Sequence, residues 1–207
     1  MEVSVSILKS NNPNDVTLKL VEETTASSIH IDLMDGDYVS EKNDDLGEVV
    51  NLFQNCRKPL EIHLMMRKNL SYAIDYLAIL KPRVIFIPLD IPNLHEYIRQ
   101  IKDYNIKVGL AIHPDTSISD IKDYLSDISL VLLMTVYPGR GGQKFLESSV
   151  ERLKSLRDLV GSNMLVGVDG GINVETVDKV RGYVDFVISG SYICMAQDYQ
   201  VQIDNLL

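Results

Sequence analysis

The chain has 207 residues, of which 45% are hydrophobic and 24% charged, so it fits one large domain with a sizeable core better than two small ones. Its 20 basic and 29 acidic residues give a formal net charge of −9, which disfavours a general nucleic-acid binder because such proteins carry a basic face. The negative charge does not exclude a phosphorylated ligand, since backbone amides can bind phosphate without an excess of lysine.

The two cysteines, Cys56 and Cys194, have no metal-like spacing and indicate no disulfide framework, so a reducing compartment is expected. The first residues lack the basic start and long apolar run of a signal peptide. No apolar segment approaches the roughly 20 residues of a membrane span. We therefore expect a cytoplasmic protein without a membrane partner.

Taken in order, the chain alternates strand patterns with helix patterns. The expected strands cover residues 3–8, 30–36, 60–65, 83–89, 106–112, 130–136, 164–169 and 184–189. The expected helices between them cover residues 15–25, 46–53, 70–80, 94–101, 118–125, 145–160 and 174–181. Polar residues 38–45 and glycine-rich residues 138–143 are expected to be loops.

Eight strands that alternate with helices predict a compact (β/α)8 TIM barrel of the α/β class, with residues 1–207 forming a single catalytic domain. A doubly wound open sheet is the alternative. It shares the alternation but gives no particular reason to stop at eight strands.

Two histidines and two aspartates fall on three of these strands and form a candidate metal site. Side chains alternate along a strand, so His30 and Asp32 share one face, while His63 and Asp169 lie on two other strands. One histidine alone is more often a hydrogen-bonded core residue, but four such groups at the strand ends favour a metal. Nitrogen and oxygen ligands suit Zn²⁺, Mn²⁺, Fe²⁺ or Co²⁺ and do not choose among them.

Three methionines also fall near strand ends, where they either fill the core or wall the site against water; both interpretations carry equal weight. They are Met34, Met65 and Met134.

Glycine segments follow the last three strands and predict a phosphate site. Each alone is only a turn signal, but three in succession favour phosphate, because barrels often bind it there through main-chain amides. The segments are Gly139, Arg140, Gly141 and Gly142, then Gly170 and Gly171, then Gly190 and Ser191.

With these residues assembled, the chain resembles the ribulose-phosphate 3-epimerase family along nearly its whole length. The most specific matches are residues 6–8, 30–36, 63–65, 134–143, 168–172 and 189–191. The resemblance implies a (β/α)8 barrel that interconverts D-ribulose 5-phosphate and D-xylulose 5-phosphate in pentose phosphate metabolism.

The resemblance also implies roles for individual residues. By position, His30, Asp32, His63 and Asp169 match the family's ligands to one divalent ion, and Asp32 and Asp169 also match its acid/base pair. Ser6 and His63 match substrate contacts, and the three glycine segments match the phosphate grip. This set suits inversion at a carbon beside a carbonyl, with a base and an acid on opposite faces and a metal stabilising the enediolate.

The chain departs from the family pattern at four places. They are Lys9 after the first strand, Asp37 after the second, Ile87 in the fourth, where a histidine is usual, and Arg140, where a phenylalanine is expected. The metal and acid/base groups match while the substrate-facing loops differ, so the chemistry is better supported than the substrate. The alternatives are an epimerase of another phosphorylated ketose, such as a hexulose 6-phosphate, and a non-catalytic metal- and sugar-phosphate-binding barrel. A homo-oligomer is expected.

Overall fold

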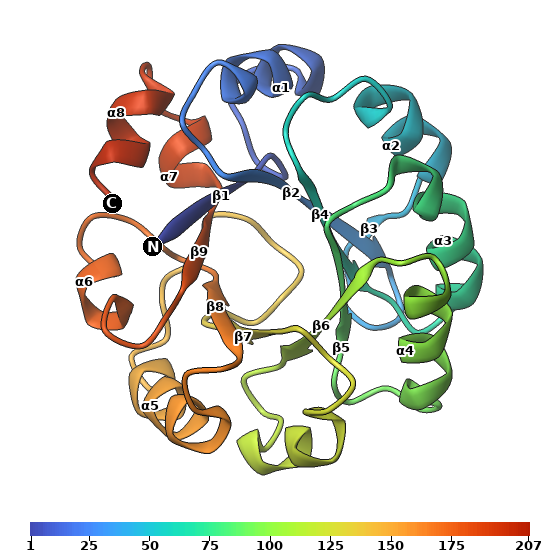
Figure 1. Cartoon of the computed structure of the whole chain (residues 1–207). Coiled ribbons are helices and arrows are strands. Elements are labelled where there is room, and N and C mark those ends of the chain that lie inside the picture. The colour runs from blue at the N-terminus through green and yellow to red at the C-terminus, as the bar shows by residue number, and fades with distance from the viewer.

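A computed structural model describes residues 1–207 and shows eight parallel strands closed into a barrel with helices around it (Figure 1). Pairing of the first strand with both the second and the last closes the sheet. The barrel strands are β1 (Glu2–Ser6), β2 (Ser28–Asp35), β4 (Leu60–Met65), β5 (Val84–Pro88), β6 (Lys107–Ile112), β7 (Leu130–Met134), β8 (Leu165–Asp169) and β9 (Phe186–Ser189). The predicted (β/α)8 barrel is thus confirmed.

The helices cover the outer face of the barrel with apolar stripes. In α3 the buried residues are Leu70, Ala73, Ile74 and Leu77, three to four positions apart as one helical face requires. The α-helices are α1 (Asn14–Glu22), α2 (Leu46–Phe53), α3 (Leu70–Leu77), α4 (Leu94–Asp103), α5 (Ser149–Val160), α6 (Val177–Val180), α7 (Ser191–Cys194) and α8 (Tyr199–Asp204), and the 3₁₀ segments are η1 (Ala78–Leu80) and η2 (Ile118–Tyr124). None of the helices is both long and apolar enough to span a membrane.

Several boundaries differ from the sequence prediction. Helix α5 starts at Ser149 instead of residue 145, because the Leu146 amide donates to the Thr135 carbonyl at 2.8 Å and holds this segment against the end of β7. The segment expected as a helix after β6 is the 3₁₀ turn η2. Within the loop expected over residues 38–45, the two-residue strand β3 (Lys42–Asn43) pairs antiparallel with the end of β2. Helices α7 and α8 were not predicted.

Strand alternation divides the core into two layers. Outward side chains pack under the helices in a cluster of 48 buried residues, whereas eight others form a second cluster. This second cluster consists of Val84, Phe86, Ala111, Leu130, Leu132, Met134, Phe186 and Ile188. Strand β7 supplies residues to both clusters, as expected for a strand buried on both faces.

Two glycines make room for two phenylalanine rings inside the barrel. A Cβ atom at Gly109 would lie 2.2 Å from the Phe86 ring, and one at Gly167 would lie 2.2 Å from the Phe186 ring. The two ring centroids are 6.2 Å apart. Phe86 also packs against the rings of His30 and His63, at centroid distances of 6.0 and 6.5 Å. The aromatic filling thus forms a floor under the predicted metal ligands.

Candidate active site

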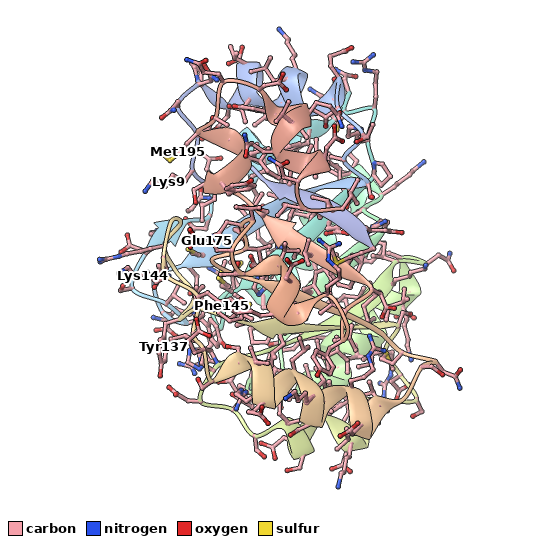
Figure 2. All side chains as sticks on the ribbon, turned by 90° about the vertical axis from the view of Figure 1, so that its left-hand side faces the viewer. Lys9, Tyr137, Lys144, Phe145, Glu175 and Met195 are labelled. Carbon is pink, nitrogen blue, oxygen red and sulfur yellow. The ribbon has the colours of Figure 1, made fainter.

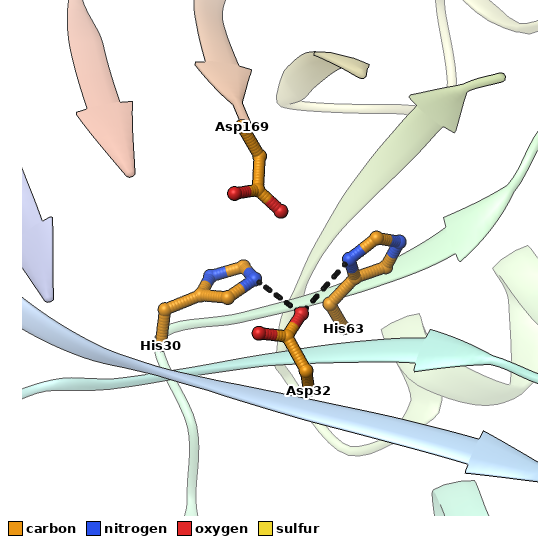
Figure 3. Close-up of side chains that lie close together, drawn as sticks. All are labelled: His30, Asp32, His63 and Asp169. Atoms are coloured by element: carbon orange, nitrogen blue, oxygen red, sulfur yellow. Dashed lines mark ion pairs between the residues drawn. The ribbon is translucent and has the colours of Figure 1, made fainter. Parts of the chain in front are cut away.

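The four predicted metal ligands converge at one end of the barrel (Figure 3). His30 and Asp32 come from β2, His63 from β4 and Asp169 from β8. In the sheet Asp32 is in register with His63, so the two side chains lie side by side. One potential ligand atom from each of the four residues lies within 4.8 Å of the other three.

Three atoms of this group are buried without a hydrogen-bond partner. They are His30 Nε2, Asp32 Oδ1 and His63 Nδ1. His30 Nε2 and His63 Nδ1 both point at Asp32 Oδ1, at 3.3 and 3.4 Å (Figure 3). Leaving a buried polar atom unsatisfied costs about 1–3 kcal/mol, so three converging atoms need a partner that they share. Two imidazoles and two carboxylates form a donor set that suits a divalent cation, and the residues therefore fit a metal site.

Ser6 faces the same interior and fixes the other oxygen of Asp32. Its hydroxyl donates to Asp32 Oδ2 at 2.8 Å. Burial opposes the negative charge of Asp32, but the His30 and His63 imidazoles outweigh it and hold the pKa of this carboxyl well below its usual range. Burial lowers the pKa of His63, which favours the neutral imidazole that ligates metals.

Asp169 has the opposite electrostatic character. Burial, reinforced by the Asp32 carboxylate, raises the pKa of Asp169 to about 7. In the absence of a cation the two carboxyls therefore differ, since the ionised form is favoured for Asp32 and the protonated form for Asp169.

A further carboxylate, Glu61, touches the site but was not among the predicted residues. It is fully buried on β4, and its Oε2 lies 3.3 Å from His30 Nδ1. Burial opposes its charge, but His30 and Arg83 outweigh it and lower the pKa of Glu61 to about 2. Strand alternation was the available signal, because Glu61 precedes His63 by two residues and shares its face.

Above the ligands lies a pocket of about 390 Å³. The predicted site residues that line it are Ser6, Asp32, Gly139, Arg140, Gly141, Gly142, Asp169, Gly170, Gly171, Gly190 and Ser191. His30 and His63 are buried and do not line it. The structure therefore brings two of the predicted metal ligands, Asp32 and Asp169, and the predicted phosphate residues to one cavity. Of the three methionines, Met65 and Met134 line this pocket and Met34 does not.

The glycine segments bring the backbone close to other chain segments. Gly170 and Gly171 have φ angles of +119° and +66°, which favour glycine. A Cβ atom at Gly171 would lie 2.6 Å from the Phe145 backbone nitrogen, and one at Gly190 would lie 3.0 Å from the Ser6 carbonyl oxygen. Side chains at these positions would push the loops apart.

Known proteins resemble this chain along nearly its whole length. The family model described as the ribulose-phosphate 3 epimerase family matches residues 2–194. A ribulose-phosphate 3-epimerase of Helicobacter pylori is 35% identical, with 100% of this chain and 96% of the relative covered. One of Bacillus subtilis is 32% identical, with 91% and 89% covered. The chain belongs to the ribulose-phosphate 3-epimerase family. As a member of this family of isomerases, it is an enzyme, as the sequence predicted.

Solved structures with low sequence identity share the fold. The 3-hexulose-6-phosphate synthase of Salmonella typhimurium superposes with a TM-score of 0.73 at 14% identity, covering 100% of this chain and 96% of that chain. The tryptophan synthase of Mycobacterium tuberculosis gives a TM-score of 0.71 at 14% identity, covering 99% and 90%. At this identity the similarity concerns the barrel alone.

Two of the four departures from the family pattern lie at the pocket mouth. Figure 2 shows Lys9 at the end of the barrel where Tyr137, Lys144 and Met195 also lie. Lys9 lies against the loop of Gly141 and Gly142, since a Cβ atom at Gly142 would lie 2.9 Å from its Nζ. Arg140 lines the same pocket. Lys9 and Arg140 therefore each add a positive charge beside the glycine segments predicted to bind phosphate.

The other two departures lie away from the reacting groups. Ile87 belongs to the outer layer under the helices, so the residue that replaces the family's histidine does not face the pocket. Asp37 forms an exposed ion pair with Lys68, with 2.8 Å between Oδ1 and Nζ.

Proposed function

We propose that this protein is a metal-dependent epimerase that interconverts D-ribulose 5-phosphate and D-xylulose 5-phosphate. The observation that carries the proposal is the placement of two carboxylates on one pocket. Asp32 on β2 and Asp169 on β8 point toward each other from different sides of the barrel (Figure 3), and both line the cavity. Inversion at a carbon requires a group on each face of it.

In one direction, the carboxylate of one aspartate removes the proton from C3 beside the carbonyl. The carboxylic acid of the other delivers its proton to the opposite face of the same carbon. After one turnover the two aspartates have exchanged protonation states, and proton exchange must restore them. The 2.8 Å hydrogen bond from Ser6 orients the Asp32 carboxylate for this work.

His30, Asp32, His63 and Asp169 would hold the divalent ion, which can be Zn²⁺, Fe²⁺, Mn²⁺ or Co²⁺. The chemistry that such an ion supplies when bound is stabilisation of negative charge on substrate oxygens beside the reacting carbon. The phosphate would lie against the backbone amides at Gly141, Gly142, Gly171 and Gly190, on the far side of the same pocket. Lys9 and Arg140 would add positive charge there.

The departures at Lys9 and Arg140 support a second candidate, an epimerase of another phosphorylated ketose such as a hexulose 6-phosphate. Both residues lie at the mouth, where substrates of different length would differ. A purely binding role is less well supported, because binding alone does not need opposed carboxylates. We further propose a cytoplasmic homo-oligomer; the cytoplasmic location is supported by two cysteines that form no disulfide.

The test is turnover on a panel of pentulose and hexulose phosphates, combined with metal analysis. The proposal expects the fastest turnover on D-ribulose 5-phosphate and close to one divalent ion per chain. His63→Ala should lose most of the metal and the activity, whereas His95→Ala, on the outer helix α4, should retain both. Fast turnover of only a hexulose phosphate would favour the second candidate. An active wild-type protein without metal would refute the metal site.

A further inference from the structure

We propose that Glu61 is a positioning residue that fixes His30 in the tautomer and orientation required to ligate the cation. The inference deepens the proposed function, because it rests on the metal site described above. Its first support is position. Glu61 lies beside His30 in the sheet register, is fully buried, and has its Oε2 3.3 Å from His30 Nδ1.

The hydrogen bonds to Glu61 divide unequally between its two oxygens. Oε1 accepts from the Ser28 hydroxyl at 2.9 Å and from Arg83 Nε at 2.8 Å, and the Arg83 Nη2 group also donates to it. Oε2 has His30 Nδ1 as its hydrogen-bond partner. An ion pair that only neutralised Arg83 would not need an oxygen directed at the imidazole.

This division determines the tautomer of His30. An ionised carboxylate only accepts hydrogen bonds, so the Nδ1 atom that faces it must carry the proton. In the neutral imidazole that ligates a metal, the lone pair then lies on Nε2, the orphaned atom that points at the predicted metal position. Carboxylates that accept from the outer nitrogen of a metal-ligating histidine act in this way in metal sites generally.

Arg83 anchors Glu61 from the other end of the barrel. It is partly exposed, and its Nη2 group also donates to Glu2 Oε2 on β1 at 2.9 Å. Neighbouring strands thus hold the Glu61 carboxylate in place, with the guanidinium on one side and the imidazole on the other. His63 has no such carboxylate behind it, so this support is specific to His30.

The decisive variant is Glu61→Gln, which has nearly the same shape. Its amide oxygen would accept from Ser28 and Arg83, and its amide nitrogen would then face His30 Nδ1 as a donor. The imidazole would have to place its proton on Nε2 and lose the ligating lone pair. We expect the affinity for Zn²⁺ to fall about 10–100-fold, measured by competition with a chromophoric chelator in the metal-free protein.

A spectroscopic readout separates positioning from general stability. In Zn²⁺-loaded wild-type protein, ¹⁵N NMR should show His30 protonated at Nδ1. Glu61→Asp keeps the accepting carboxylate and should therefore keep this signature, with a smaller loss of affinity than Glu61→Gln. The matched control is Glu22→Gln, a largely buried carboxylate paired with Arg57 on the outside of the barrel. It should lower the melting temperature without changing the affinity for Zn²⁺.

If Glu61→Gln does not fold because Arg83 has lost its charged partner, the same measurements are made on the double variant Glu61→Leu/Arg83→Leu, which removes both charges and leaves no side chain at position 61 that could accept from His30 Nδ1. Wild-type affinity for Zn²⁺ in the folded variant would overturn the positioning role and leave the proposed function standing. A wild-type protein that binds no divalent ion would overturn both, so the two failures are distinguishable.

Discussion

Arg140 and Glu41 form an ion pair across the pocket mouth, with 2.7 Å between Nε and Oε1. It joins the loop after β7 to the loop after β2, which also approach where a Cβ atom at Gly139 would lie 3.3 Å from Val39. The two side chains are 73% and 39% exposed, so the pair contributes about 0–1 kcal/mol to stability. The ion pair is important because it holds the guanidinium of Arg140, which lines the pocket, toward the loop after β2.

The first prediction concerns this guanidinium. Arg140→Gln should raise KM for the phosphorylated substrate roughly tenfold or more, because a hydrogen bond to a charged group contributes about 1.5–3 kcal/mol. Glu41→Gln should leave KM unchanged or lower it, since it frees the same cation. Lys144→Gln is a control from the same end of the barrel, and steady-state kinetics compare the three. Equal KM values for Arg140→Gln and wild type would rule out a phosphate contact.

A second prediction addresses the two aspartates. Asp32→Asn and Asp169→Asn should each reduce epimerisation by at least about 10²–10⁴-fold, the contribution of general acid–base catalysis. In heavy water, a variant that retains metal and one working base should wash deuterium into C3 of one epimer only. The two variants should show opposite epimer preferences. Near-normal epimerisation with metal bound in both would exclude the two-base mechanism.

A third prediction concerns Asp35, which joins the loops after β2 and β4. Its Oδ1 accepts from the amides of Asp37 and Tyr38, both at 2.8 Å, and its Oδ2 accepts from those of Arg67 and Lys68 at 2.7 and 2.8 Å. An amide side chain would accept at only one position, so Asp35→Asn should lower the free energy of unfolding by about 1–3 kcal/mol at neutral pH.

The same carboxylate predicts a dependence on pH. Burial opposes the charge of Asp35, but the four amides outweigh it and hold the pKa below its usual value. The stabilisation is therefore complete above the unfolded pKa of about 4 and is lost as the pH falls through the folded pKa. Urea unfolding at several pH values should show wild type and Asp35→Asn converging below about pH 4. The matched control is Asp178→Asn, at an exposed carboxylate.

A fourth prediction tests the aromatic filling. Gly109→Ala should lower the free energy of unfolding by about 1–3 kcal/mol, the usual cost of overpacking, because its Cβ atom would meet the Phe86 ring. Gly182→Ala, where no atom lies within 4 Å of the new Cβ, is the matched control. The second change Phe86→Leu should relieve part of the loss in a double-mutant cycle. Additive effects would contradict the proposed clash.

Much of the barrel was predictable because strand alternation and apolar runs are local signals. The shared face of His30 and Asp32 follows from a period of two, and the pairing of β2 with β4 places them beside His63. The same alternation places Glu61 on the face of His63, but the sequence does not show which residues an acidic side chain on a strand will pair with. Its pairing with His30 and Arg83 depends on strand register, which the sequence alone does not fix.

The missed elements are short or stabilised by distant contacts. Strand β3 has two exposed polar residues and forms only because it meets the end of β2. Helix α8 had a local signal, since the Asp198 side chain accepts from the Val201 amide, and Tyr199, Ile203 and Leu206 are buried at helical spacing. The start of α5 depends on the contact between Leu146 and Thr135, which are far enough apart in sequence to escape a periodic pattern.

The two phenylalanine rings at the barrel centre also decide how the reacting groups meet water. Because Phe86 and Phe186 fill the space opposite Gly109 and Gly167, the lumen is closed below the ligands. Asp32 and Asp169 both line the pocket above the ligands, so the proposed substrate would lie between them and bulk water. A bound sugar phosphate would then close the mouth of the pocket, and the transferred protons would exchange with water only after it leaves. The barrel interior thus opens to water on the side of the pocket and is closed by the two phenylalanine rings on the other side.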